Sequence, residues 1–132
     1  MKGFHLRILP GEFSVWRLDP DAPLPPLDFS SFLSITRTLD ELSIVSSTTD
    51  VPAGARAEAG WRCLKVEGPL AFEMTGVLAG LSAPLARAKV PVFVVSTYDT
   101  DYILVKDSDL DRACSALDCE SHVIARPKKA KS

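Results

Sequence analysis

Residues 90–106 read Val-Pro-Val-Phe-Val-Val-Ser-Thr-Tyr-Asp-Thr-Asp-Tyr-Ile-Leu-Val-Lys. Two apolar runs, residues 90–97 and 102–106, flank the turn-forming residues 98–101, so the stretch predicts an antiparallel hairpin. The first run is continuous and β-branched, which is typical of a strand buried on both faces. The elements on either side can be ordered around this hairpin.

The segment before the hairpin predicts a strand and a helix. Trp61–Val66 alternates apolar and polar side chains, as a half-buried strand does. Apolar residues at helical spacing then predict a helix over residues 71–89. Pro84 lies inside it and removes one backbone donor, so we expect a bend or a break near residues 80–82.

The segment after the hairpin predicts a second helix and a last strand. Ser108-Asp109 offers a helix N-cap before a short apolar stripe that ends at Leu117, and residues 121–125 form the strand. The order is βαββαβ, which predicts an α+β fold with an antiparallel sheet and both helices on one face.

The N-terminal half resembles a worn copy of the same unit. A shift of 60 residues places residues 36–45 on residues 96–105, each a polar turn followed by an apolar strand. Asp19–Leu27 contains four prolines, so a loop must replace the first helix there.

Two further elements are expected in this half. Phe4–Leu9 and Phe13–Leu18, joined at Pro10-Gly11, predict an opening hairpin, and Pro52–Ala59 is a candidate short helix.

The composition is that of an ordinary globular domain, with 132 residues, 46% hydrophobic and 24% charged. No apolar run approaches the roughly 20 residues of a spanning helix, so we expect no membrane partner. A net charge of −2 and a pI near 5.6 give no basic field, so we expect no nucleic acid. Arg7 and Pro10 interrupt the N-terminal apolar segment, so we expect no export signal.

The cysteines and histidines indicate a reducing compartment and no metal centre. Cys63, Cys114 and Cys119 are odd in number and form no CxxC motif, which favours buried thiols in the cytoplasm over disulfides. His5 and His122 lie near opposite ends of the chain, and we expect both at strand edges rather than on a metal. We expect no cofactor.

Three segments carry a family likeness. Gly68–Ala79, Ala83–Ala86 and Val92–Val105 together resemble the ACT domain family, specifically small bacterial tandem-ACT proteins related to the CASTOR amino-acid sensors. Ser34–Val45 is similar to the first unit of the same group. The resemblance implies a regulatory fold of ferredoxin-like units that pair their sheets or helices and bind amino acids at the resulting interfaces.

The resemblance also fixes the expected organisation of the chain. We expect two tandem ferredoxin-like ACT-type units: a degenerate one over residues 1–60 and a complete one over residues 61–126. Residues 127–132 form a basic tail that we expect to be disordered. A homodimer is the expected state.

The family pattern assigns a ligand site to two segments. The first is the loop between the first strand and first helix of the second unit, and the second is the end of the strand that faces it. Carried over to this chain, these residues are Gly68, Pro69, Leu70, Ala71, Phe72, Val95, Ser96, Thr97 and Tyr98, with Asp99, Asp101 and Glu73 as the acidic candidates.

The residue chemistry is compatible with this site but does not require it. Backbone N–H groups at a helix start and the hydroxyls of Ser96 and Thr97 can bind a carboxylate, and the aspartates can bind an ammonium group. The same residues also serve as ordinary turns, so a ligand-free dimerisation module remains the alternative. No nucleophile elbow or phosphate loop is present, so we expect no enzyme.

Overall fold

The computed structural model describes residues 3–67, 76–120 and 122–126, and it has an α+β fold, as the sequence predicts. Contacts divide the chain into an N-terminal unit, residues 11–61, and a C-terminal unit, residues 1–10 with 62–132. The strand β5 (Arg56–Val66) contributes its first half to one unit and its second half to the other.

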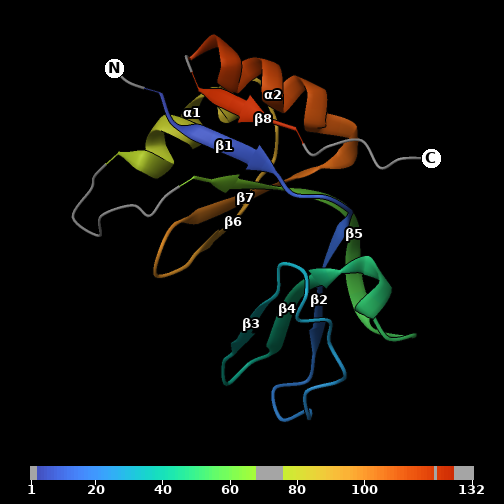
Figure 1. Ribbon diagram of the computed structural model, residues 1–132. Coiled ribbons are helices and arrows are strands. Elements are labelled where there is room, and N and C mark those ends of the chain that lie inside the picture. The colour runs from blue at the N-terminus through green and yellow to red at the C-terminus, as the bar shows by residue number, and fades with distance from the viewer. Residues whose placement is uncertain (1–2, 68–75, 121, 127–132) are drawn as a thin grey trace. The chain divides into compact units, whose positions relative to one another are not determined.

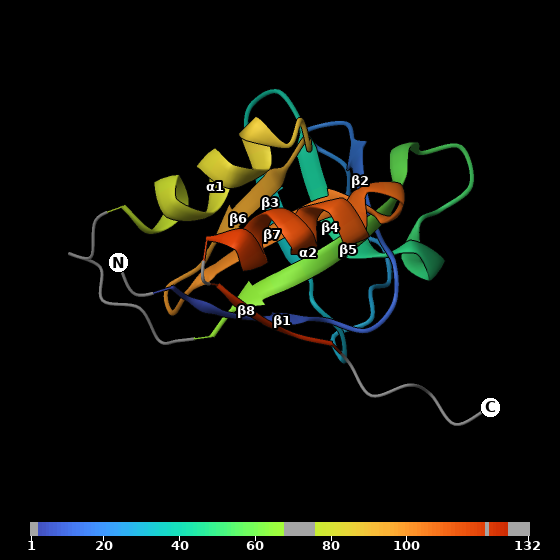
Figure 2. The ribbon, with the colours of Figure 1, turned by 90° about the horizontal axis from the view of Figure 1, so that it is seen from above.

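The C-terminal unit is a mixed sheet covered by two helices on one face (Figures 1 and 2). Its strand order is β6-β7-β5-β1-β8, where β1 is antiparallel to β5 and parallel to β8. The expected all-antiparallel sheet is therefore wrong. The elements are β1 (His5–Ile8), β6 (Phe93–Ser96), β7 (Asp101–Lys106), β8 (Val123–Ala125), α1 (Val77–Arg87) and α2 (Leu110–Cys119).

The parallel pair arises because β1 lies between β5 and β8 instead of pairing with the next strand, β2 (Phe13–Leu18). The predicted opening hairpin is wrong for the same reason. Leu6 and Ile8 are each 1% exposed and belong to the core under the helices, so this burial outweighs the local turn at Pro10-Gly11.

The helix α1 is continuous over Val77–Arg87 although Pro84 lies inside it, so the predicted break is absent. The expected start of this helix at residue 71 falls outside the described residues. Its buried face consists of Val77, Leu81, Pro84 and Leu85. The three aliphatic residues of this face, Val77, Leu81 and Leu85, join the core cluster with Leu110, Ala113 and Leu117 of α2. Within the described part of the chain, neither helix has the length and apolar character that a membrane crossing requires.

The N-terminal unit is an antiparallel sheet of order β3-β4-β2-β5. It contains β3 (Ser34–Arg37), β4 (Leu42–Ser47) and a single 3-10 turn, η1 (Thr48–Asp50). The proline-rich segment forms no helix, as expected. The short helix expected at Pro52–Ala59 is wrong, because Gly54 turns the chain at φ +84° and β5 begins at Arg56.

The two units repeat the same hairpin with an offset of 59 residues. Ser34 pairs with Val45 in one unit and Phe93 with Leu104 in the other, and η1 is matched by η2 (Asp107–Asp109). The offset of 60 residues drawn from the sequence is therefore one residue too long, which matters because a one-residue slip exchanges the two faces of a strand.

The edge strand β6 corrects one expectation about burial. Its residues alternate between half-buried and exposed, and β6 pairs only with β7 among the described strands. The continuous apolar run therefore does not signal a strand buried on both faces.

Candidate functional site

The predicted site centres on the turn that joins β6 to β7, and a threonine pair shapes this turn. The Thr97 amide donates to the carbonyl oxygen of Thr100 across 2.8 Å, and Thr97 Oγ1 donates to the same oxygen across 3.0 Å. The Thr100 amide lies 3.4 Å from Thr97 Oγ1. The Thr97 hydroxyl is therefore used to hold the turn.

A second bond ties the turn to the end of β5. Thr100 is 4% exposed, and its Oγ1 donates to the carbonyl oxygen of Val66 across 2.6 Å. This contact places the turn beside the point from which the predicted ligand loop departs. The loop residues themselves, Gly68, Pro69, Leu70, Ala71 and Phe72, together with Glu73, lie outside the described residues.

The described members of the predicted site do not converge on one side of the sheet. Ser96 pairs with Asp101, and this pair shares the helix-covered face with Ile103. Val95 pairs with Tyr102 on the opposite face. Tyr98 is 79% exposed at the turn, and Asp99 is exposed beside it. Ser96 and Asp101 are therefore the members that face the side of the helices.

Tyr102 is a neighbour of this site that the sequence did not single out. Burial raises the pKa of its phenol, and the nearby Cys63 and Asp99 raise this pKa further. The phenol therefore stays neutral and can act as a hydrogen-bond donor.

Two of the three thiols and the imidazole of His122 are buried in the fold. All three cysteines are free, and Cys63 and Cys114 are buried, but Cys119 is exposed, so the expectation of three buried thiols is wrong for it. His122 precedes β8 and is 5% exposed, with hydrogen bonds at both ring nitrogens. Among the described residues, no group of three or more His, Cys, Asp or Glu side chains could hold a metal ion.

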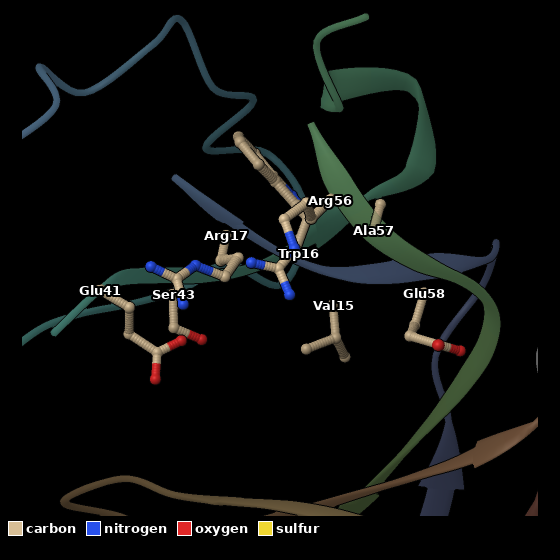
Figure 3. Close-up of a pocket in the computed structure, with 8 residues that line it drawn as sticks. All are labelled: Val15, Trp16, Arg17, Glu41, Ser43, Arg56, Ala57 and Glu58. Atoms are coloured by element: carbon tan, nitrogen blue, oxygen red, sulfur yellow. The ribbon is translucent and has the colours of Figure 1, made fainter. Parts of the chain in front are cut away.

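A cleft in the N-terminal unit was missed by the sequence interpretation (Figure 3). It has a volume of about 450 Å³ and lies over β2, β4 and β5. Its lining combines two arginines and two glutamates with four uncharged residues: Val15, Trp16, Arg17, Glu41, Ser43, Arg56, Ala57 and Glu58. The sequence carries one signal of this cleft, the alternation of charged residues in Arg56-Ala57-Glu58. The sequence interpretation assigned no binding role to this half of the chain and so did not use it.

Strand register explains why these side chains meet. Arg17 pairs with Ser43 on one side and with Arg56 on the other, so the three side chains form a row on one face. Trp16 points to the other face, where it is 1% exposed and its Nε1 donates to Ser46 Oγ across 2.9 Å. This buried bond joins β2 and β4, the strands that carry Arg17 and Ser43.

Comparison with known proteins gives matches to both halves of the chain. A family model described as an ACT domain matches residues 56–119, and a second model, described as an N-terminal domain, matches residues 11–54. The cytosolic arginine sensor for mTORC1 subunit 1 of Bos taurus is 33% identical over 98 residues, which are 66% of this chain and 30% of the sensor. The matched region is therefore less than a third of that relative.

Solved structures extend the likeness to the whole chain. The crystal structure of a protein from Agrobacterium tumefaciens has a TM-score of 0.92 and 35% identity, and the match covers 100% of this chain and 99% of that one. The ligand-free regulatory subunit of aspartate kinase from Thermus thermophilus has a TM-score of 0.57 and 8% identity, with 83% and 93% covered. This second likeness concerns the fold alone.

Proposed function

Because the chain belongs to the ACT domain family and is related to arginine sensors, we propose that it is a regulatory protein that binds an amino acid. In this proposal the protein carries no catalytic site of its own and acts in the cytoplasm. Ligand binding would favour one conformation of the protein. A partner that binds this conformation preferentially would then be regulated by the ligand.

The proposed organisation is a tandem of two ferredoxin-like units. The matched hairpins and 3-10 turns of the two units, offset by 59 residues, support it. The first unit is degenerate, because the helix between its first two strands is replaced by the proline-rich loop.

The observation that carries the binding proposal is the bond from Thr100 Oγ1 to Val66. It anchors the β6–β7 turn where the chain enters residues 68–72, and it leaves Ser96 and Asp101 on the face of the helices. A hydroxyl and a carboxylate at this position supply acceptors for an ammonium group. Backbone N–H groups of the loop would supply the donors for a carboxylate.

The proposed assembly is a homodimer, with the ligand at an interface between units or subunits. The edge strand β6 supports this assembly, because it pairs only with β7 among the described strands and Val94 on it is 37% exposed. The same observation favours the alternative function, a ligand-free dimerisation module. Binding distinguishes the two functions.

The deciding experiment is a thermal-shift screen of the standard amino acids at millimolar concentration. A ligand present at 100 times its Kd stabilises a protein by about 2.7 kcal/mol, which moves the melting temperature by several degrees. We expect one amino acid to do so, and we expect Asp101→Asn to reduce the response. Asp118→Asn is the matched control, because Asp118 is an exposed aspartate on α2.

Two results would overturn parts of the proposal. A response that persists unchanged in Asp101→Asn would place the ligand elsewhere on the molecule. The absence of any response, together with a dimer in light scattering, would favour the ligand-free module.

A further inference from the structure

The cleft of the N-terminal unit contains two arginines that lie opposite each other. Arg17 and Arg56 are direct cross-strand partners on adjacent strands. Like charges directly opposite each other destabilise a sheet. None of the ion pairs formed among the described residues involves either side chain.

The two arginines differ in how firmly they are held. Arg17 is half-buried, and its Nη2 donates to the carbonyl oxygen of Asp40 across 3.0 Å. Arg56 is exposed, and its side chain makes no hydrogen bond within the described part of the chain. Both guanidinium groups line the cleft in Figure 3. One arginine is thus fixed in place, and the second is free to close on a bound group.

Acidic and hydroxyl groups lie on the same cleft wall. Glu41 and Ser43 approach from the β4 side, and Glu58 lies on the far side of the arginines (Figure 3). The two arginines and two glutamates have no net formal charge together, so the cleft is not a general anion trap. The positive charges of the arginines lie between the two glutamates, and Val15 adds an apolar surface to the cleft.

We propose that this cleft is a second small-molecule site, which binds a zwitterion through its carboxylate on Arg17 and Arg56 and its ammonium group on Glu41 and Ser43. Guanidinium groups bind carboxylates through paired N–H donors, and two of them can share one carboxylate. A volume of about 450 Å³ accommodates a free amino acid or a similarly small zwitterion. This site goes beyond the proposed function, because all of its residues belong to the other unit.

The test titrates the protein with ligands and identifies which residues respond. The full chain is titrated with free amino acids, with acetate as a plain carboxylate and with inorganic phosphate, while amide shifts are followed by ¹H–¹⁵N NMR. We expect an amino acid to move the amides of residues 15–17, 41–43 and 56–58. We expect Arg56→Gln to weaken that binding at least tenfold, and Asp101→Asn to leave it unchanged.

A second readout needs no ligand. Removing one of two unpaired like charges relieves repulsion, so the free Arg56→Gln protein should melt at the same or a higher temperature than wild type, with a difference that shrinks as salt is added. Glu41→Gln provides an independent binding variant, and Arg87→Gln in the other unit is the charge-matched control. A structural role for Arg56 would instead lower the melting temperature.

The outcomes separate this site from the proposed function. Shifts confined to residues 96–101, or wild-type affinity in both cleft variants, would overturn the cleft proposal alone. Acetate or phosphate binding as tightly as every amino acid would overturn the zwitterion assignment. The absence of all binding would overturn the cleft and the proposed function together.

Discussion

The imidazole of His122 donates from Nε2 to the carbonyl oxygen of Gly80 across 3.1 Å, and this carbonyl is the one that Pro84 leaves without its helical donor. Nδ1 of the same ring accepts from the Phe4 amide across 2.9 Å, so the ring proton lies on Nε2. The ring also stacks on Phe4 at 5.7 Å between centroids. One side chain thus satisfies α1 and the start of β1 together.

Replacement of His122 by phenylalanine tests this arrangement. His122→Phe keeps an aromatic ring beside Phe4 but leaves the Phe4 amide and the Gly80 carbonyl without partners. A fully buried group left unpaired costs about 1–3 kcal/mol, and these two groups are only partly buried, so we expect the free energy of unfolding to fall by about 2–4 kcal/mol in total. Urea denaturation measures the loss.

The double variant shows whether Pro84 is the reason. Pro84→Ala gives Gly80 a helical N–H donor, so His122→Phe should cost about 1 kcal/mol less in that background. Equal costs of His122→Phe in both backgrounds would contradict the link between the two residues.

The helix prediction failed at this point for a physical reason. Pro84 does remove a donor, but a histidine 38 residues further along the chain replaces it, and no local pattern reveals such a partner. The hairpin of residues 93–106 was predictable because its turn and its strands are adjacent in the sequence. The position of β1 was not predictable, because its partners β5 and β8 are distant in the sequence.

Of the two candidate sites, one was predictable from the sequence and the other was not. The resemblance identified Ser96 and Asp101, whose pairing follows from the hairpin. The cleft depends on the register between β2 and β5, which shifts between Phe13 and Val15 opposite the positive-φ Gly60. Because an irregularity of this kind decides which residues face each other, the row of Arg17, Ser43 and Arg56 could not be read from sequence alternation alone.

The bond between Thr100 and Val66 predicts a second stability effect. Thr100→Val preserves the shape of the side chain but removes the buried hydrogen bond to the Val66 carbonyl, so we expect a loss of about 1–2 kcal/mol. Thr100→Ser keeps the hydroxyl and should lose less. Chemical denaturation of the three proteins measures this order, and a Thr100→Ser loss as large as that of Thr100→Val would show that the methyl group, not the bond, matters.

Thiol accessibility predicts a sharp difference among the cysteines. Cys119 is exposed at the end of α2, whereas Cys63 and Cys114 are buried and burial raises the pKa of both thiols. The thiolate is the reactive form, so at pH 8 a thiol reagent should modify Cys119 rapidly and the other two only on unfolding. Mass spectrometry after brief labelling counts the modified sites, and Cys119→Ser should remove the rapid phase. Rapid modification of Cys63 would contradict its burial.

The pKa of Cys63 predicts a loss of stability at alkaline pH. Burial raises this pKa from its ordinary value of 9.0 to about 12, so the folded protein retains a proton that the unfolded chain releases. The stabilising contribution is complete below pH 9 and is lost as the pH rises from 9 towards 12, at up to about 1.4 kcal/mol per pH unit. Wild type and Cys63→Ala are compared by urea denaturation across this range.

The comparison isolates the thiol because the alanine variant differs in the slope of stability against pH, not only in its level. The small cavity in Cys63→Ala lowers stability by a similar amount at every pH. Tyr102 adds to the alkaline loss in both proteins, since burial raises its pKa as well, but it does so less in the variant that lacks the neighbouring thiolate. Wild-type stability should therefore fall more steeply than that of Cys63→Ala above pH 9. Parallel curves of stability against pH would show that the Cys63 thiol ionises in the folded protein as it does in the unfolded chain.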